Sequence, residues 1–195
     1  MTTKTSVQSE IATNVGEKIE MVKWHIQRYD ALRASTANRA AMVLSANALL
    51  LASSTFLLDK IVANLNLYSS YQRCFVLVSV SLTLLLLAIS IFYAIRGVIA
   101  VSKTSRDLFG YDIPKHPFFS QRDTIESFSG FQSFKEGFMD TNSEKMLSYA
   151  LGDLWTVINQ HFYRYQNLRT AIRFLSAGIV VFLISAFALI LFIMF

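Results

Sequence analysis

The sequence predicts an all-α membrane protein in which three transmembrane helices carry long amphipathic helical extensions into the cytoplasm. Its 195 residues are 53% hydrophobic and 16% charged, with a mean hydropathy of +0.42. Soluble domains average about 25% charged residues. Three long runs lack any charged residue, and outside these runs apolar residues recur at helical spacing. This composition excludes a disordered tail, a disulfide scaffold and a collagen-like chain.

The three charge-free runs are the predicted transmembrane helices, at residues 40–58, 74–95 and 174–195. A helix needs about 20 mostly apolar residues to cross a bilayer. The second and third runs satisfy this without interruption. The first run is diluted by serines and Asn47, so a buried helix of a soluble domain is its alternative interpretation.

The start of the sequence does not resemble a signal peptide. The first apolar run follows a polar stretch that contains acidic residues, whereas a signal peptide places a short apolar region directly behind a basic one. We therefore expect a multi-pass protein of a bacterial inner (plasma) membrane. A secreted protein or an outer-membrane barrel would have a different pattern.

Lysine and arginine predict the orientation, because they are enriched in cytoplasmic segments. They are frequent in residues 1–39 and 96–173, whereas the link at 59–73 carries only Lys60 and Arg73. We expect the N-terminus and residues 96–173 to be cytoplasmic, and the link and Phe195 to face outward. A nucleic-acid-binding surface is the competing explanation of the net charge of +5. No recognition motif accompanies the basic residues, and we expect no direct nucleic-acid binding.

The C-terminal part has a long apolar stripe whose steps alternate between four and three residues, which is typical of packed helices. The stripe consists of Leu147, Leu151, Leu154, Ile158, His161, Tyr165, Leu168, Ile172, Leu175, Ile179, Phe182, Ala186, Leu189 and Ile193. Asp140, Asn142 and Ser143 are candidate caps at its start. We predict one helix over 143–195, about 75 Å long, with a cytoplasmic stalk at 143–173. Leu151, Leu154 and Ile158 are its candidate interface.

The N-terminal segment has a similar stripe, formed by Ile11, Val15, Ile19, Val22, Ile26 and Tyr29. Arg33 and Thr36 interrupt its apolar register. The two stalks are expected to pack on each other or on copies of themselves. His161 occupies a core-type position, where a histidine is either a pH switch or a partly exposed side chain with a hydrogen-bond partner.

The connecting segment at 96–142 is rich in turn-forming residues and aromatic side chains. Pro114, Pro117 and three glycines mark turns. Six phenylalanines follow, Phe118, Phe119, Phe128, Phe131, Phe134 and Phe138. They can pack on the stalks or at the inner leaflet, or they can form a stacking platform for a signal molecule or a partner. Phe118 and Phe119 are the candidate contacts for such a signal or partner.

No catalytic motif is present. The sequence contains no dinucleotide-binding or P-loop glycine pattern, no nucleophile elbow and no zinc-protease motif. The three histidines are far apart, without the spacing of metal ligands, and the single cysteine, Cys74, has no disulfide partner. We predict no enzyme activity, no cofactor and no metal.

The first span carries the most specific local pattern. Small residues recur at four-residue steps, which allows helices to approach closely in lipid. These residues are Ala37, Ala41 and Ser45 on one line and Ala48 and Ala52 on another. Asn47 is the strongest polar group in the three spans. It either makes one hydrogen bond in the helix packing, or forms a ring between copies that holds or gates an assembly. Arg39, Ala40, Ser45 and Asn47 are the candidate assembly residues.

These residues also carry a resemblance. Thr36-Ala-Asn-Arg-Ala-Ala-Met-Val-Leu-Ser-Ala-Asn47 resembles the A-D-x-K-A…N segment of Pycsar-type transmembrane effectors, and Pro117-Phe118-Phe119-Ser120 is similar to a short proline-phenylalanine stretch of that family. The order of helices and spans also matches, from about Glu17 to Leu183. Ala37 stands where the family has an acid, and Arg39 where it has a lysine. Arg39, Ala40 and Asn47 carry over by position.

The resemblance implies an antiphage function. Such effectors stay inactive until infection, then assemble in the inner membrane, impair it, and cause growth arrest or death. It further implies membrane lipid and copies of the chain as partners, and a regulator encoded nearby, either a nucleotide cyclase product or a retron reverse transcriptase complex. The alternative is a structural or scaffold membrane protein that binds a cytoplasmic partner through its stalks. A small transporter is disfavoured because the spans contain no repeat and no charge.

Overall fold

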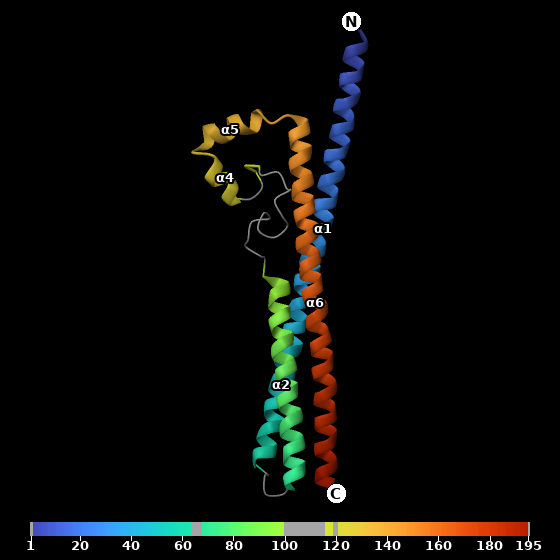
Figure 1. The fold of residues 1–195 in the computed structure, drawn as a ribbon, viewed down its shortest axis with the longest axis vertical. Helices are drawn as coiled ribbons and strands as arrows, with labels where there is room; N and C mark the ends of the chain where they lie inside the picture. The colour runs from blue at the N-terminus through green and yellow to red at the C-terminus, as the bar shows by residue number, and fades with distance from the viewer. Residues whose placement is uncertain (1, 64–67, 100–115, 119–120, 195) are drawn as a thin grey trace. The chain divides into compact units, whose positions relative to one another are not determined.

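The structure is a computed structural model that describes residues 2–63, 68–99, 116–118 and 121–194. Within these residues the chain is all-α, as predicted, and no strand occurs. The helices are α1 (Thr2–Ala63), α2 (Ser70–Val98), α4 (Gln121–Ser127), α5 (Phe131–Met139) and α6 (Ser143–Met194) (Figure 1). Three of them, over Val15–Ala63, Ser70–Val98 and Ser143–Phe192, are long and apolar enough to cross a membrane.

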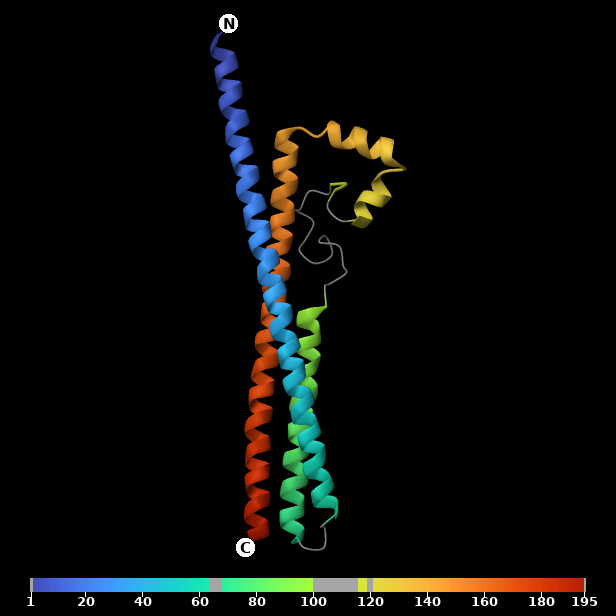
Figure 2. The same ribbon diagram turned by 180° about the vertical axis from the view of Figure 1, so that it is seen from behind.

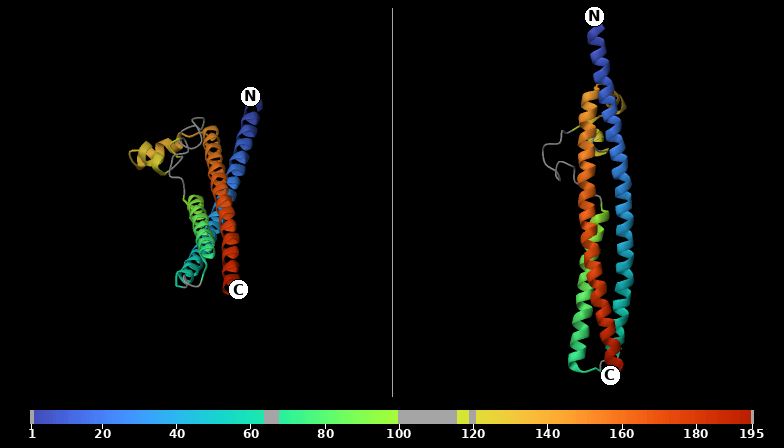
Figure 3. Two further views of the ribbon diagram at one scale, coloured as in Figure 1. Left: turned by 60° about the horizontal axis from the view of Figure 1, so that its bottom comes forward. Right: turned by 90° about the vertical axis from the view of Figure 1, so that its right-hand side faces the viewer.

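Helix α1 is continuous, so the predicted stalk at 1–39 and the predicted span at 40–58 form one helix that extends to Ala63 (Figure 3). No proline interrupts this part of the sequence. The serine and threonine hydroxyls that dilute the first span donate to carbonyls four residues earlier: Ser45 to Ala41, Ser53 to Leu49, Ser54 to Leu50 and Thr55 to Leu51. Hydroxyls bonded in this way are compatible with an apolar surrounding.

Helices α2 and α6 begin at capped residues. Ser69 and Gln72 form a reciprocal capping box at the start of α2, which satisfies backbone donors that have no partner within the helix. At the start of α6 the Asn142 side chain accepts a hydrogen bond from the Lys145 amide at 2.8 Å. Asn142 was one of three candidate caps. The single long C-terminal helix is confirmed, because α6 runs unbroken from Ser143 to Met194.

The chain divides into two compact units. Unit 1 contains residues 1–33 and 101–162, and unit 2 contains residues 34–100 and 163–195. In unit 2 the helices α1, α2 and α6 lie side by side (Figures 1 and 2). One core cluster joins all three helices through Ala40, Val43, Leu87, Ala94, Leu168, Ala171 and Leu175. A second cluster contains Ile61, Tyr68, Val76, Val80 and Leu189.

Buried residues in unit 2 alternate steps of four and three along each helix. On α2 they are Val76, Val80, Thr83, Leu87, Ser90, Ala94 and Gly97. On α6 they are Arg164, Leu168, Ala171, Leu175, Gly178, Ser185 and Leu189, with Asn167 beside the stripe. This spacing is that of a coiled-coil bundle.

The predicted register of α6 is half wrong. Leu168, Leu175 and Leu189 are buried, but Tyr165, Ile172 and Ile179 are exposed. Ala171, Gly178 and Ser185 are buried instead, each one position earlier than the predicted residue. At two steps the prediction chose the larger apolar residue, Ile172 or Ile179, whereas the smaller Ala171 and Gly178 face the other helices.

The predicted interruption of the α1 stripe at Arg33 and Thr36 is also wrong. Thr36 is 5% exposed, Arg33 is half-buried, and the stripe continues at Ala40 and Val43. The threonine methyl and the aliphatic stem of the arginine can occupy such positions while their polar groups stay satisfied.

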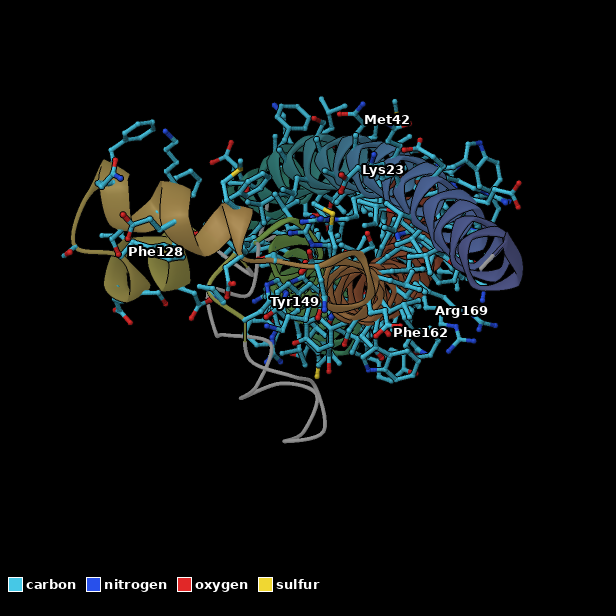
Figure 4. All side chains as sticks on the ribbon, turned by 90° about the horizontal axis from the view of Figure 1, so that it is seen from above. Lys23, Met42, Phe128, Tyr149, Phe162 and Arg169 are labelled. Carbon is cyan, nitrogen blue, oxygen red and sulfur yellow. The ribbon has the colours of Figure 1, made fainter. Side chains whose placement is uncertain are left out.

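In unit 1 four phenylalanines form a compact cluster, Phe118, Phe128, Phe134 and Phe138, with ring centroids 5.5 to 6.3 Å apart. Phe128 lies between α4 and α5 (Figure 4). Phe131 is 79% exposed and stays outside the cluster. The phenylalanines therefore pack mainly on one another. Phe119 lies outside the described residues.

Candidate functional site

A chain of hydrogen bonds links the three helices of unit 2. Asn47 on α1 is fully buried, and its Nδ2 donates to the Val43 carbonyl at 2.8 Å and to Ser90 Oγ on α2 at 3.0 Å. Ser90 Oγ in turn donates to the Ala171 carbonyl on α6 at 2.9 Å. Interhelical hydrogen bonds of this kind contribute about 0.6 kcal/mol each on average in membrane bundles. We call Asn47, Ser90 and the Ala171 carbonyl the polar relay.

The buried amide oxygen of Asn47 accepts no hydrogen bond within the described residues. A buried acceptor without a donor costs about 1 to 3 kcal/mol. Asn47 therefore stabilises the bundle through its nitrogen and opposes it through its oxygen.

The interior around the relay is polar and small. Ser54, Thr83 and Ser185 come from the three helices and are 0% exposed. Each hydroxyl donates to a carbonyl of its own helix four residues earlier, at 2.8 to 2.9 Å. These three hydroxyls make no hydrogen bond from one helix to another. Separation of the helices would therefore break few polar contacts.

Two glycines determine how closely α2 and α6 pack. Neither glycine was predicted as a site residue. A Cβ on Gly97 would lie 3.5 Å from the Arg164 carbonyl oxygen, and one on Gly178 would lie 3.4 Å from Leu87 Cδ2. Larger side chains cannot fit at Gly97 without moving backbone. Ser90, the central member of the relay, was also missed, because a single serine in an apolar run has no distinguishing pattern.

The candidate assembly residues lie on different faces of α1. Ala40 and Asn47 are buried in unit 2, whereas Arg39 and Ser45 are exposed. The small residues Ala41, Ala48 and Ala52 are exposed as well. Within this single chain the Asn47 amide nitrogen bonds to Ser90, and both interpretations of Asn47 stay predictions. The exposed line of small residues stays a predicted contact between copies.

In unit 1 the connecting segment is held to α6 by His116. This histidine is 2% exposed and stacks on Tyr149, with ring centroids 4.2 Å apart and planes 13° apart. Its Nε2 lies 3.5 Å from Asp153 Oδ1, an ion pair when the imidazole is protonated. A cavity of about 170 Å³ adjoins them, lined by His116, Phe118, Phe138, Thr141, Met146, Tyr149, Ala150 and Asp153. It is smaller than the roughly 300 Å³ at which small-molecule pockets begin.

The other predicted site residues of unit 1 lie on α6. His161 is half-buried and its ring lies 5.9 Å from that of Tyr29 on α1, so the two stalks touch. Leu154 and Ile158 are half-buried, and Leu151 is 49% exposed. His116, Tyr149 and Asp153 were not predicted as a group, because the positions are separated in sequence and only the fold brings them together.

Other kinds of site find no support in the described part of the chain. There, no three histidine, cysteine or acidic side chains cluster in a way that could hold a metal ion. Cys74 has a free, exposed thiol. Comparisons with protein-family models, with curated proteins and with solved structures find no match to this chain.

Proposed function

We propose that this protein is a three-span membrane effector of an antiphage abortive-infection system, which assembles in the inner membrane after infection and impairs it. The proposal rests on the resemblance described above and on one observation, the inverted polarity of unit 2. Its interior holds Asn47, Ser54, Thr83, Ser90 and Ser185, all 0% exposed, beside an apolar core that includes Leu87 and Ile61. Its surface carries large apolar side chains, among them Leu49, Phe56, Val78, Leu85 and Phe187, each at least 58% exposed.

This inversion supports insertion into a bilayer. In water, fully exposed leucine and phenylalanine side chains would cost about 1.5 to 3 kcal/mol each relative to burial, whereas lipid tails solvate them. A groove of about 390 Å³ on the same surface is lined almost entirely by apolar atoms of Tyr71, Cys74, Phe75, Val78, Ser79, Leu82, Val181 and Ile184. In this proposal the N-terminus and residues 96–173 are cytoplasmic, because lysine and arginine are frequent in these segments.

The polar interior supports a change of partners. Apolar burial drives helix association weakly in lipid, because lipid tails are as apolar as leucine. The polar relay contributes little, and the Asn47 oxygen gains a donor if α1 pairs with another copy. An arrangement within one chain and one between copies then differ by little free energy, so a trigger with modest differential affinity can shift the population.

The test is membrane depolarisation. The chain is induced alone, together with its neighbouring genes, and during phage infection, while a membrane-potential dye is read. We expect depolarisation only in the triggered state. If no condition, including infection, causes depolarisation, the effector function is wrong.

The substitution Asn47→Leu distinguishes a role of Asn47 in assembly from a role in helix packing alone. Leucine inserts well, so expression and insertion should persist while triggered depolarisation is lost. Ser53→Leu is the matched control, because it removes an exposed hydroxyl of the same helix. Depolarisation by Asn47→Leu at the level of the unchanged chain would reduce Asn47 to a packing residue.

A scaffold function is the second candidate, and the stalks favour it. Trp24 on α1 and Trp155 and Phe162 on α6 are 53 to 60% exposed outside the charge-free runs. Exposed aromatic residues are typical of partner-binding surfaces. A scaffold would be harmless when triggered and would co-purify with one cytoplasmic partner in a fixed ratio.

A further inference from the structure

One end of unit 2 carries arginines on all three helices without any acidic residue nearby in sequence. These are Arg39 on α1, Arg96 on α2, and Arg164, Arg169 and Arg173 on α6. No aspartate or glutamate occurs between Asp30 and Asp59, between Asp59 and Asp107, or after Asp153. In residues 34–57, 80–99 and 163–192 every basic residue is an arginine and none is a lysine.

The core packing places Arg39, Arg96 and Arg169 near one end of unit 2, while Arg173 lies closer to the polar relay, two residues after Ala171. The cluster at this end includes Ala40, Ala94, Leu168 and Ala171. Arg39, Arg96, Arg169 and Arg173 each lie one or two positions from one of these residues in sequence. At a rise of 1.5 Å per residue this is an offset of at most about 3 Å along the helix.

Four of the arginine side chains are exposed, those of Arg39, Arg96, Arg169 and Arg173. We call these four the arginine collar, and Figure 4 shows Arg169 projecting from α6. Arg164 is 8% exposed and interacts within the protein, so it is not a member. Within the described residues none of these four guanidinium groups forms an ion pair with a carboxylate, which leaves their charges available to anions from outside.

An aromatic layer adjoins the collar, because Phe92 lies one turn before Arg96 and Phe174 directly follows Arg173. The Arg96 guanidinium lies over the Phe92 ring at 5.3 Å. Tyr93 stacks on Phe174 of α6, with centroids 6.2 Å and planes 3° apart. Tryptophan and tyrosine side chains concentrate at the level of lipid headgroups, so Tyr93 supports a position of the collar near the depth of the phosphates.

We propose that the arginine collar binds the phosphates of anionic phospholipids. The inference rests on the membrane insertion in the proposed function. A guanidinium is always charged and donates two parallel hydrogen bonds to a phosphate, whereas a lysine offers a point charge. The negatively charged headgroup of a lipid such as phosphatidylglycerol neutralises the positive charge of the collar. A zwitterionic headgroup has no net charge and does not neutralise it.

The test titrates the detergent-solubilised full chain with phosphatidylglycerol or phosphatidylcholine and counts bound lipids by native mass spectrometry. We expect phosphatidylglycerol to bind at least tenfold more tightly. Each arginine removed should weaken its binding about fivefold, so Arg169→Gln with Arg173→Gln should weaken it about 25-fold. Replacing the same pair by lysine should give an intermediate loss.

The matched control is Lys18→Gln with Lys60→Gln, which removes the same charge from exposed positions away from the collar. It should leave the lipid affinity unchanged. If the glutamine pair on α6 fails to fold, Arg39→Gln with Arg96→Gln tests the collar from the other two helices.

Three results would overturn the proposal: equal affinity for the two lipids, full phosphatidylglycerol affinity in both glutamine pairs, or displacement of the lipid by an equal concentration of inorganic phosphate. None of these measurements reads toxicity. If the chain depolarises membranes but binds the two lipids equally, the proposed function stands and the proposal for the arginine collar is refuted.

Discussion

The chain uses aromatic and small polar residues in opposite ways in its two units. In unit 1 Phe118, Phe128, Phe134 and Phe138 pack on each other. In unit 2 many large apolar side chains are exposed, while the space between the helices holds small and polar residues together with a core of leucine, isoleucine and valine. Water rewards burial of large apolar side chains, whereas lipid rewards close helix packing and satisfied polar groups. This contrast is the one that we expect if unit 2 lies in lipid and unit 1 in water.

The strongest test of the difference between the units introduces a lysine at two equally exposed positions of α6, one in each unit. Leu183 in unit 2 is 59% exposed and Phe162 in unit 1 is 60% exposed. We expect Leu183→Lys to cost about 2.5 to 3.5 kcal/mol of insertion free energy, because lysine is then placed near the middle of the hydrocarbon. Phe162→Lys should change stability by about 0.5 kcal/mol or less. The fraction of chain resistant to carbonate extraction measures the first, and equal effects at both sites would refute a lipid-facing surface.

A second prediction concerns close packing. Gly97→Leu should destabilise unit 2 by about 1 to 3 kcal/mol through overpacking, because the Arg164 backbone leaves room for little more than a methyl group. Gly97→Ala should be tolerated. Gly16→Leu is the control, since nothing lies within 4 Å of its added Cβ. Thermal unfolding in nanodiscs gives the shifts, and a fully stable Gly97→Leu would mean that α2 and α6 are further apart.

The third prediction concerns the phenylalanine cluster. Phe134 contacts the other three rings of the cluster. Phe134→Ala should destabilise α4 and α5 by about 2 kcal/mol, less than the 3 to 5 kcal/mol of a fully buried phenylalanine. Hydrogen exchange of the α5 amides should accelerate accordingly. The exposed Phe131→Ala should leave this exchange unchanged, and acceleration of equal size there would contradict the cluster.

The smallest effect is expected in the polar relay. Ser90→Ala removes the bonds to Asn47 and to the Ala171 carbonyl, and should cost about 0.6 kcal/mol, at most about 1.7 kcal/mol. Ser81→Ala, at an exposed position of the same helix, should have no effect on unfolding in nanodiscs. A loss of several kcal/mol at Ser90 would show that the relay is a major source of stability and that partner exchange is costly.

The three long helices could be predicted from the sequence because their signals are local, whereas α4 and α5 within the turn-rich segment were not predicted. Charge-free runs, the absence of proline and the Asn142 cap all act within a few residues. The face of each helix in contact with the others was harder to predict. The stripe through Tyr165, Ile172 and Ile179 follows the rule for proteins in water, and the buried line through Ala171, Gly178 and Ser185 follows the rule for lipid.

The candidate site was predictable only in part, for a related reason. Asn47 stands out because an asparagine in an apolar run requires a partner. Its partner Ser90 lies 43 residues away and belongs to another helix. The His116, Tyr149 and Asp153 group likewise depends on how the connecting segment folds back on α6, which no local pattern encodes.

The most direct test of the inverted bundle is a spin-label scan along α6 in bilayers. Single cysteines are placed from 176 to 192 in a Cys74→Ser background, and collision rates with oxygen and with a water-soluble nickel complex are measured. We predict high oxygen and low nickel accessibility at positions 180, 183, 184, 187 and 190, with low oxygen accessibility at 178, 185 and 189. Oxygen minima at 179 and 186, or nickel accessibility along the outer positions, would contradict the account.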